Sequence, residues 1–153
     1  MVKGTTVKQT KEFQAAMRKV MEERIPFNHV LGLRVESFDP RAPKLRFDMR
    51  PELVGNPARQ ILHGGVISAT LDVTGGYAIM LALYEESKDP HKTFPNMGTI
   101  DLRVDYLRPG RGRYFVATGR IVRKGSRIAV VHMDLENDEG ALIATGSGAY
   151  AVG

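Results

Sequence analysis

Asp72 lies nine positions after His63, inside a long apolar stretch, and this spacing is where the sequence first indicates chemistry. The stretch from Gly64 to Leu83 has the length and composition of one mostly buried helix. An unpaired carboxylate is costly to bury, so we expect Asp72 to have a hydrogen-bond partner, a ligand or a catalytic task.

Two adjacent glycines, Gly64 and Gly65, open this stretch and leave the N–H groups of the helix start uncovered. Such groups can donate to a carbonyl oxygen on which negative charge develops. They can equally bind a phosphate anion. Asp72 favours the first alternative, because its charge would repel a phosphate but can activate water or attack an electrophilic carbonyl. The pattern therefore indicates acyl transfer or hydrolysis.

The geometry of a helix adds a constraint on this site. A helix that begins near Gly64 separates His63 from Asp72 by roughly 12–13 Å along its axis. One chain cannot bring both residues to the same reacting atom. In a two-fold dimer, however, a pair of antiparallel helices sets the start of one against the middle of the other. We therefore expect a homodimer with shared active sites.

The same helix carries a second glycine pair, Gly75-Gly76, in its interior. Each interior glycine costs about 1 kcal/mol relative to alanine. We expect close packing against the sheet or a partner helix to be the reason, with close approach of a ligand as the alternative.

The elements that must position these residues are antiparallel strands and one further helix. Gln9 to Glu23 has helical apolar spacing and ends at Pro26, and a Pro- and Gly-containing loop at 51–62 precedes the central helix at 64–85. A polar loop is expected from Glu85 to Asn96. Strands are predicted at 30–38, 44–49, 100–106, 113–123, 127–136 and 141–152, with turn residues between them. A twisted antiparallel sheet that wraps one apolar helix accommodates every element.

Length and composition predict a single domain at 9–153 after a flexible tail at 1–8. The chain has 153 residues and no cysteine, which excludes disulfides and thiolate metal sites and favours a cytoplasmic location. No stretch reaches the roughly 18 consecutive apolar residues of a membrane span. The N-terminus lacks the hydrophobic region of a signal peptide. No His, Asp or Glu spacing indicates a metal.

Positive charge is concentrated in one part of the chain. Eight basic residues lie between positions 103 and 127, with Asp105 as the single acidic residue among them. This density indicates an anionic partner such as a phosphorylated cofactor or nucleic acid. Solvated strand edges and turns are the alternative interpretation.

His63-Gly64-Gly65 with Asp72, followed by the segment DYLRPG at 105–110, resembles the hotdog-fold acyl-CoA thioesterases of the phenylacetic-acid-pathway (PaaI-like) type. The resemblance extends from about Phe27 to the C-terminus. It implies an α+β hotdog fold, in which an antiparallel sheet wraps the central helix, with an additional N-terminal helix. It also implies hydrolysis of an acyl-CoA to free acid and CoA.

The resemblance assigns roles residue by residue. It implies that Asp72 is the general base or nucleophile, that Gly64 and Gly65 polarise the thioester carbonyl, and that His63 shapes the helix start. Asn56 matches an asparagine near the leaving sulfur, although it lies seven residues before His63 where the family has six. Thr99 matches a hydroxyl that positions water. Strand alternation brings it to the helix side only through a β-bulge, and Ser68 is the alternative hydroxyl.

The basic cluster gains a specific interpretation from the same resemblance. Arg108, Arg111, Arg123 and Lys124 are candidates to hold the phosphates of coenzyme A, which enters as part of the substrate. No other cofactor, no metal, no nucleic acid and no membrane partner is expected. A dimer of dimers is common in the family. The alternatives are a hotdog hydratase or dehydratase, an acyl-CoA-sensing regulator and a binding protein without catalysis.

Overall fold

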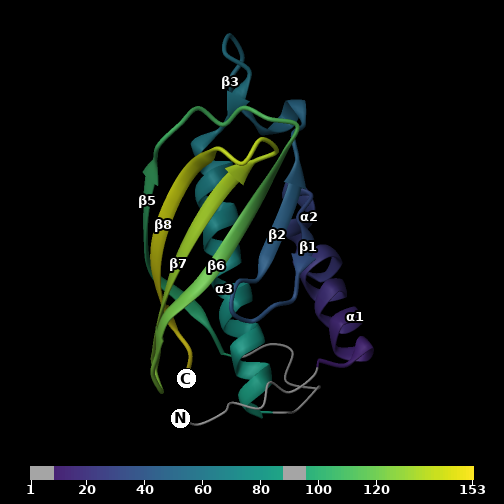
Figure 1. The fold of residues 1–153 in the computed structure, drawn as a ribbon, viewed down its shortest axis with the longest axis vertical. Coiled ribbons are helices and arrows are strands. Elements are labelled where there is room, and N and C mark those ends of the chain that lie inside the picture. The colour runs from purple at the N-terminus through teal and green to yellow at the C-terminus, as the bar shows by residue number, and fades with distance from the viewer. Residues whose placement is uncertain (1–8, 88–95) are drawn as a thin grey trace.

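An antiparallel sheet curls around one long helix in the computed structural model, which describes residues 9–87 and 96–153 (Figure 1). The helix is α3 (Gly64–Ser87). Within the described residues the sheet has six strands, which are in spatial order β1 (Arg34–Ser37), β2 (Lys44–Asp48), β6 (Tyr114–Lys124), β7 (Ile128–Asn137), β8 (Leu142–Ala151) and β5 (Gly98–Tyr106). The predicted tail at 1–8 and residues 88–95 of the predicted loop lie outside the described residues.

The core lies between α3 and the concave face of the sheet. Leu71, Ile79 and Leu81 of α3 are fully buried, as are Phe47 and Phe115, which stack on neighbouring strands with ring centroids 5.2 Å apart. α3 has the length and hydropathy of a membrane span, but 61% of that stretch is buried inside the fold. Its apolar character on all sides follows from being wrapped by the sheet.

The N-terminal helix continues further than the sequence predicted. α1 (Lys11–Lys19) runs into a π-helical turn, η1 (Val20–Arg24), and then α2 (Pro26–Leu31). Pro26 ends one helix and also begins the next, because its fixed φ suits a first helical position. The predicted strand at 30–38 is therefore shorter, and β1 starts only after Gly32, which takes a left-handed φ of 71°.

The buried side chain of Asn28 secures this irregular turn. Ile25 N–H donates to Val20 O, five residues back, and the Asn28 amide donates to Met21 O at 3.0 Å. The N-terminal helices are held against α3 by Phe13, whose ring stacks on Tyr84. The N-terminal helices thereby form one wall beside the middle of α3.

The predicted loop at 51–62 contains regular structure. A 3₁₀ turn, η2 (Pro51–Leu53), leads into a hairpin of β3 (Val54–Asn56) and β4 (Ile61–Leu62), which projects at the end of the molecule where α3 begins (Figure 1). His63 N–H donates to Leu53 O at 2.8 Å, so the hairpin closes directly onto the helix start. Gly55 permits this closure, because a Cβ there would lie 2.5 Å from His63 Cα.

Close packing, as predicted for the interior glycine pair, holds for Gly75 but not for Gly76, which lines the cavity beside Asp72. A Cβ at Gly75 would lie 2.1 Å from the Tyr150 hydroxyl, whereas a Cβ at Gly76 would meet only the flexible end of Met97 at 3.3 Å. We expect Gly75→Ala to lower the free energy of unfolding by about 1–3 kcal/mol. We expect Gly76→Ala to be neutral, or stabilising by up to about 1 kcal/mol, through helix propensity. Denaturant unfolding of both variants measures the difference, and equal losses would contradict the assignment.

Candidate active site

Asp72 has the partner that its position required. It is half-buried in the single chain, and its Oδ1 accepts a hydrogen bond from Thr99 Oγ1 at 2.9 Å. The register of β5 against β8 shifts between Thr99 and Asp101, which is the β-bulge that strand alternation demanded. Ser68, the alternative hydroxyl, instead donates to Gly65 O at 3.2 Å within its own helix. Thr99 therefore orients the Asp72 carboxylate through one of its two oxygens.

Tyr150, which the sequence analysis did not single out, contacts the main chain of the same residue. Its hydroxyl donates to Asp72 O at 3.1 Å. Burial raises the pKa of this hydroxyl far above its usual range, and the negative charge of Asp72 raises it further. Tyr150 is therefore a protonated donor at neutral pH. Its aromatic character in a glycine-rich strand was the available sequence signal, but nothing in the sequence pairs it with Asp72.

The start of α3 is capped by His63. Its Nδ1 accepts a hydrogen bond from Gly65 N–H at 2.8 Å, which orients the imidazole ring over the helix start. The Tyr106 hydroxyl donates to Gly64 O at 3.1 Å. The first N–H of a helix has no acceptor within the helix. Gly64 N–H is therefore the available donor for a substrate oxygen, while Gly65 N–H is used by His63.

Two separate cavities flank these two parts of the motif. The first, of about 170 Å³, lies beside the middle of α3 and contains Asp72 and Thr99. Its remaining lining is mainly apolar and comes from the N-terminal helices, α3 and the start of β5: Met21, Ile25, Asn28, Val73, Gly76, Tyr77, Met80, Met97, Gly98 and Tyr150. Such a pocket, apolar with a few convergent polar groups, is typical of a small-molecule site.

The second cavity, of about 340 Å³, surrounds Gly64 at the helix start. Tyr106 and two arginines, Arg59 and Arg108, are among its lining residues. Arg59 belongs to the β3–β4 turn and was not among the predicted basic residues, because only the folded hairpin brings it next to Gly64. The positive end of α3 and both guanidinium groups make this cavity suited to an anionic group.

Asn56 lies on the hairpin rather than inside either cavity. Its Oδ1 accepts from Arg59 N–H at 3.1 Å and stabilises the β3–β4 turn. Within the described part of the chain its amide nitrogen donates to no acceptor, so the group that could face a substrate is this NH₂. The role expected for Asn56 beside the leaving sulfur stays a prediction.

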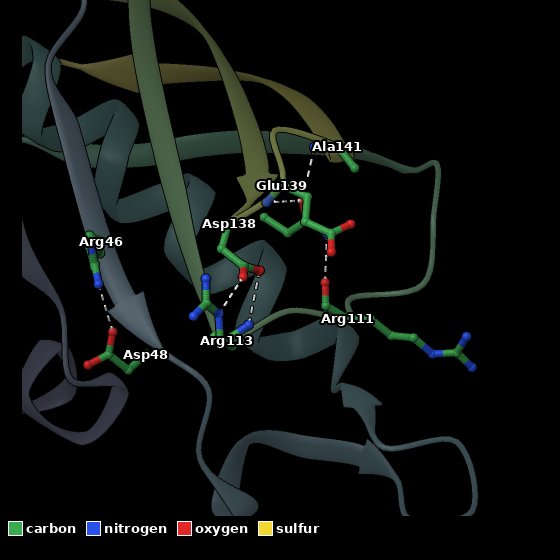
Figure 2. Close-up of polar contacts among 8 residues, drawn as sticks. Arg46, Asp48, Arg111, Arg113, Asp138, Glu139 and Ala141 are labelled. Carbon is green, nitrogen blue, oxygen red and sulfur yellow. Dashed lines mark hydrogen bonds and ion pairs between the residues drawn. The ribbon is translucent and has the colours of Figure 1, made fainter.

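The structure separates the predicted basic residues. Arg108 lies at the α3 start and donates to Leu142 O at 2.8 Å, whereas Lys124 pairs with Glu86 at 2.9 Å, near the opposite end of the helix. Arg123 is the neighbour of Lys124 on β6 and shares that end. The Arg111 side chain points away from the ribbon in Figure 2, close to the β7–β8 turn.

Part of the positive charge is neutralised within the fold. Figure 2 shows Arg113 paired with Asp138, at 2.8 Å, where β6 begins beside the β7–β8 turn. This arginine holds the pKa of the Asp138 carboxyl below its usual range. A second pair, Arg46 with Asp48, lies on β2 in the same view. Among residues 9–87 and 96–153, no three His, Asp or Glu side chains converge as a metal site would require.

Comparisons with known proteins agree with this geometry. Residues 59–144 match the family model described as the thioesterase superfamily. The chain is 42% identical over 134 residues to the medium/long-chain acyl-CoA thioesterase YigI of Escherichia coli K12, and the match covers 84% of this chain and 86% of YigI.

Solved structures give the same result. A Shewanella oneidensis protein related to the thioesterase superfamily is 40% identical with a TM-score of 0.79, covering 93% of this chain and 96% of that one. The fold also matches that of the E. coli PaaI protein from the phenylacetic acid degradation operon, at 20% identity and a TM-score of 0.74, with 92% of each chain covered. The resemblance found in the sequence is thus confirmed, and the chain belongs to the thioesterase superfamily, as a thioester hydrolase with the hotdog fold.

Proposed function

We propose that this enzyme hydrolyses acyl-CoA thioesters, with the acyl chain in the apolar cavity beside Asp72. The observation that carries the proposal is the Asp72 carboxylate, held by Thr99 at the edge of a cavity with a largely apolar lining. The 42% identity to a medium/long-chain acyl-CoA thioesterase supports the same substrate class. Met21, Met80 and Met97 give the cavity flexible walls, which suit unbranched acyl chains.

The active site is proposed to be shared between two subunits. About eight residues of helix separate Gly64 from Asp72, or roughly 12 Å of rise, and the two residues line different cavities. β5 is an edge strand of nine residues whose side chains are mostly exposed in the single chain, including Ile100 at 56% and Tyr106 at 54%. Proteins rarely leave so long an edge uncovered. A second copy paired along β5 would cover it and bring Gly64 of one subunit toward the partner's Asp72.

In the proposed mechanism, Gly64 N–H donates to the thioester carbonyl oxygen and stabilises the negative charge that develops there. Asp72 of the other subunit accepts a proton from a water molecule, whose oxygen attacks the carbonyl carbon. The tetrahedral intermediate then collapses, the carbon–sulfur bond breaks, and the CoA thiolate takes a proton. Thr99 keeps the carboxylate oriented through these steps.

A nucleophilic role for Asp72 is the second possibility for the same site. The carboxylate would attack the thioester carbon, the carbon–sulfur bond would break to release the CoA thiolate, and the resulting mixed anhydride would be hydrolysed by water. The hydrogen bond from Thr99 engages Oδ1 of the carboxylate and is compatible with either role.

The phosphates of CoA are proposed to contact Arg59 and Arg108, which share the cavity of Gly64. Arg111 lies, like Arg108, on the connection between β5 and β6, and its side chain points outward (Figure 2). The contribution expected from Arg123 and Lys124 stays a prediction without such support, because Lys124 pairs with Glu86 near the far end of α3.

Replacing Arg108 with glutamine is expected to raise KM for an acyl-CoA by about 10- to 100-fold, because a hydrogen bond to a charged group is worth about 1.5–3 kcal/mol. The KM for the matching N-acetylcysteamine thioester, which lacks the phosphates, should not change. Arg120→Gln is the control, since Arg120 pairs with Asp134 on β7. Equal effects on both substrates would contradict phosphate binding.

A panel of butanoyl-, octanoyl-, dodecanoyl-, hexadecanoyl- and phenylacetyl-CoA tests the proposed function itself. Thiol release is measured for each, and the highest kcat/KM is expected for the medium and long chains, which fill the apolar cavity. Absence of hydrolysis across the whole panel would overturn the proposal and favour a binding or regulatory protein.

A further inference from the structure

Two hydrogen bonds from the sheet hold Asp72, one at its side chain and one at its main chain. Thr99 Oγ1 donates to the carboxylate at 2.9 Å, and the Tyr150 hydroxyl donates to the Asp72 carbonyl oxygen at 3.1 Å. Thr99 and Tyr150 are direct cross-strand partners on β5 and β8. The two donors therefore form one unit, in which neighbouring strands grip the same helical residue.

Two positions beside Tyr150 are glycine, because a side chain at either one would collide with the tyrosine. The tyrosine side chain is only 2% exposed. A Cβ at Gly75 would lie 2.1 Å from its hydroxyl, and one at Gly148 would lie 2.8 Å from its ring. Glycine inside a helix or a strand is unfavourable. Two such positions around one tyrosine indicate that the placement of its hydroxyl against α3 is a specific feature of this site.

We infer that Tyr150 is a positioning residue for thioester hydrolysis, which holds the Asp72 turn of α3 at the depth where its carboxylate meets Thr99. The direction of a helical side chain is set by the position of its own backbone. A hydrogen bond to the Asp72 carbonyl fixes both the rotation and the axial position of that turn against the sheet. The inference rests on the proposed function, and it adds to it a residue that does not touch the substrate carbonyl.

Thr74 provides a matched control on the same helix. It is fully buried, its side chain is not among the residues that line the cavity beside Asp72, and its hydroxyl likewise donates to a main-chain oxygen, that of Thr70, at 2.7 Å. Loss of either hydroxyl removes one buried hydrogen bond to a main-chain oxygen. The hydroxyl of Tyr150 contacts Asp72 and that of Thr74 bonds Thr70, so only Tyr150→Phe should affect the chemical step.

The experiment compares Tyr150→Phe and Thr74→Val in steady-state hydrolysis of the best acyl-CoA substrate. Both variants are expected to lower Tm by about 2–4 °C. Tyr150→Phe should lower kcat by roughly 10- to 100-fold, because small displacements of a catalytic group are costly, while KM stays within about two-fold. Thr74→Val should keep kcat within about two-fold of the parent. A parental kcat in Tyr150→Phe would overturn the inference, as would an equal loss of kcat in both variants.

A double-mutant cycle with Thr99→Val separates positioning from general loosening. If Tyr150 acts by keeping Asp72 within reach of Thr99, the second substitution should add little once the first is present. Multiplying losses would show independent effects and would contradict the inference.

A crystal structure of Tyr150→Phe gives a readout that does not depend on turnover. We expect Asp72 Oδ1 to move beyond hydrogen-bond distance of Thr99 Oγ1, and an unchanged 2.9 Å contact would refute the positioning role even if the parent proved inactive. An inactive parent with a displaced carboxylate would instead refute the acyl-CoA substrate and leave the role of Tyr150 supported.

Discussion

Replacing Asp72 with asparagine is expected to lower kcat for acyl-CoA hydrolysis by about 10²- to 10⁴-fold, the usual contribution of a general base. The fold should survive, because an amide oxygen can still accept the hydrogen bond from Thr99 that the carboxylate Oδ1 accepts now. KM should change little, since Asp72 is proposed to act on water or on the carbonyl carbon rather than to bind CoA. Thiol release under saturating substrate measures the loss.

Asp48→Asn is the matched control for this substitution. Asp48 is an exposed carboxylate on β2 that pairs with Arg34 at 2.9 Å, and its replacement should leave kcat unchanged. Hydrolysis that persists in the Asp72 variant would refute the proposed mechanism. A single turnover of the parent in water enriched in the heavy oxygen isotope distinguishes the two roles of Asp72, because label appearing in the aspartate itself would identify a nucleophile.

The second large effect is expected when two inactive variants are combined. Gly64→Pro removes the proposed N–H donor at the first position of α3, where proline is well tolerated, and should lower kcat by about 10²- to 10³-fold. Asp72→Asn removes the other half of the site. If each active site takes Gly64 from one subunit and Asp72 from the other, a heterodimer of the two variants contains one intact site and one doubly defective site.

Activity should therefore return on mixing. Random exchange of equal amounts yields heterodimers as about half of all dimers, each with one of two sites intact, so roughly a quarter of the parental activity is expected. Co-expression with two different affinity tags isolates the heterodimer, which should show about half the parental kcat per dimer. Mixing Asp72→Asn with itself supplies the control. A heterodimer with no activity would place both halves of the site in one chain and would refute the shared arrangement.

Thr99 shows that strand alternation alone does not predict which side of β5 a side chain occupies. Alternation placed Thr99 on the wrong side of β5 unless a bulge intervened, and the register shift between Thr99 and Asp101 is that bulge. A bulge depends on how two strands pair over their whole length, which local sequence does not encode. The hairpin at 54–62 was missed for a similar reason, since β3 and β4 have three and two residues and their register is held by contacts to His63 and Gly110.

The N-terminal region differs from its prediction at Pro26. The helix predicted from Gln9 onward does end just before this proline, at Arg24, but a second helix, α2, begins there and extends to Leu31. Proline is compatible with either position, because its missing N–H is harmless at a helix start. The buried amide of Asn28, which donates to Met21 O, links the second helix to the π-helical turn that ends the first.

The sequence by itself determined the central helix, the strands that follow it, the spacing of His63, Gly64 and Asp72, and the family. These follow from local periodicity and from residue types at fixed spacing, and neither depends on how the elements pack together. Only the tertiary structure decided which groups surround Asp72. Thr99 and Tyr150 reach it from strands that lie 27 and 78 residues away in the chain. Contacts at such separations depend on the register of β5 against β8 and on the space that Gly75 and Gly148 leave for Tyr150. Neither can be predicted from a local sequence pattern.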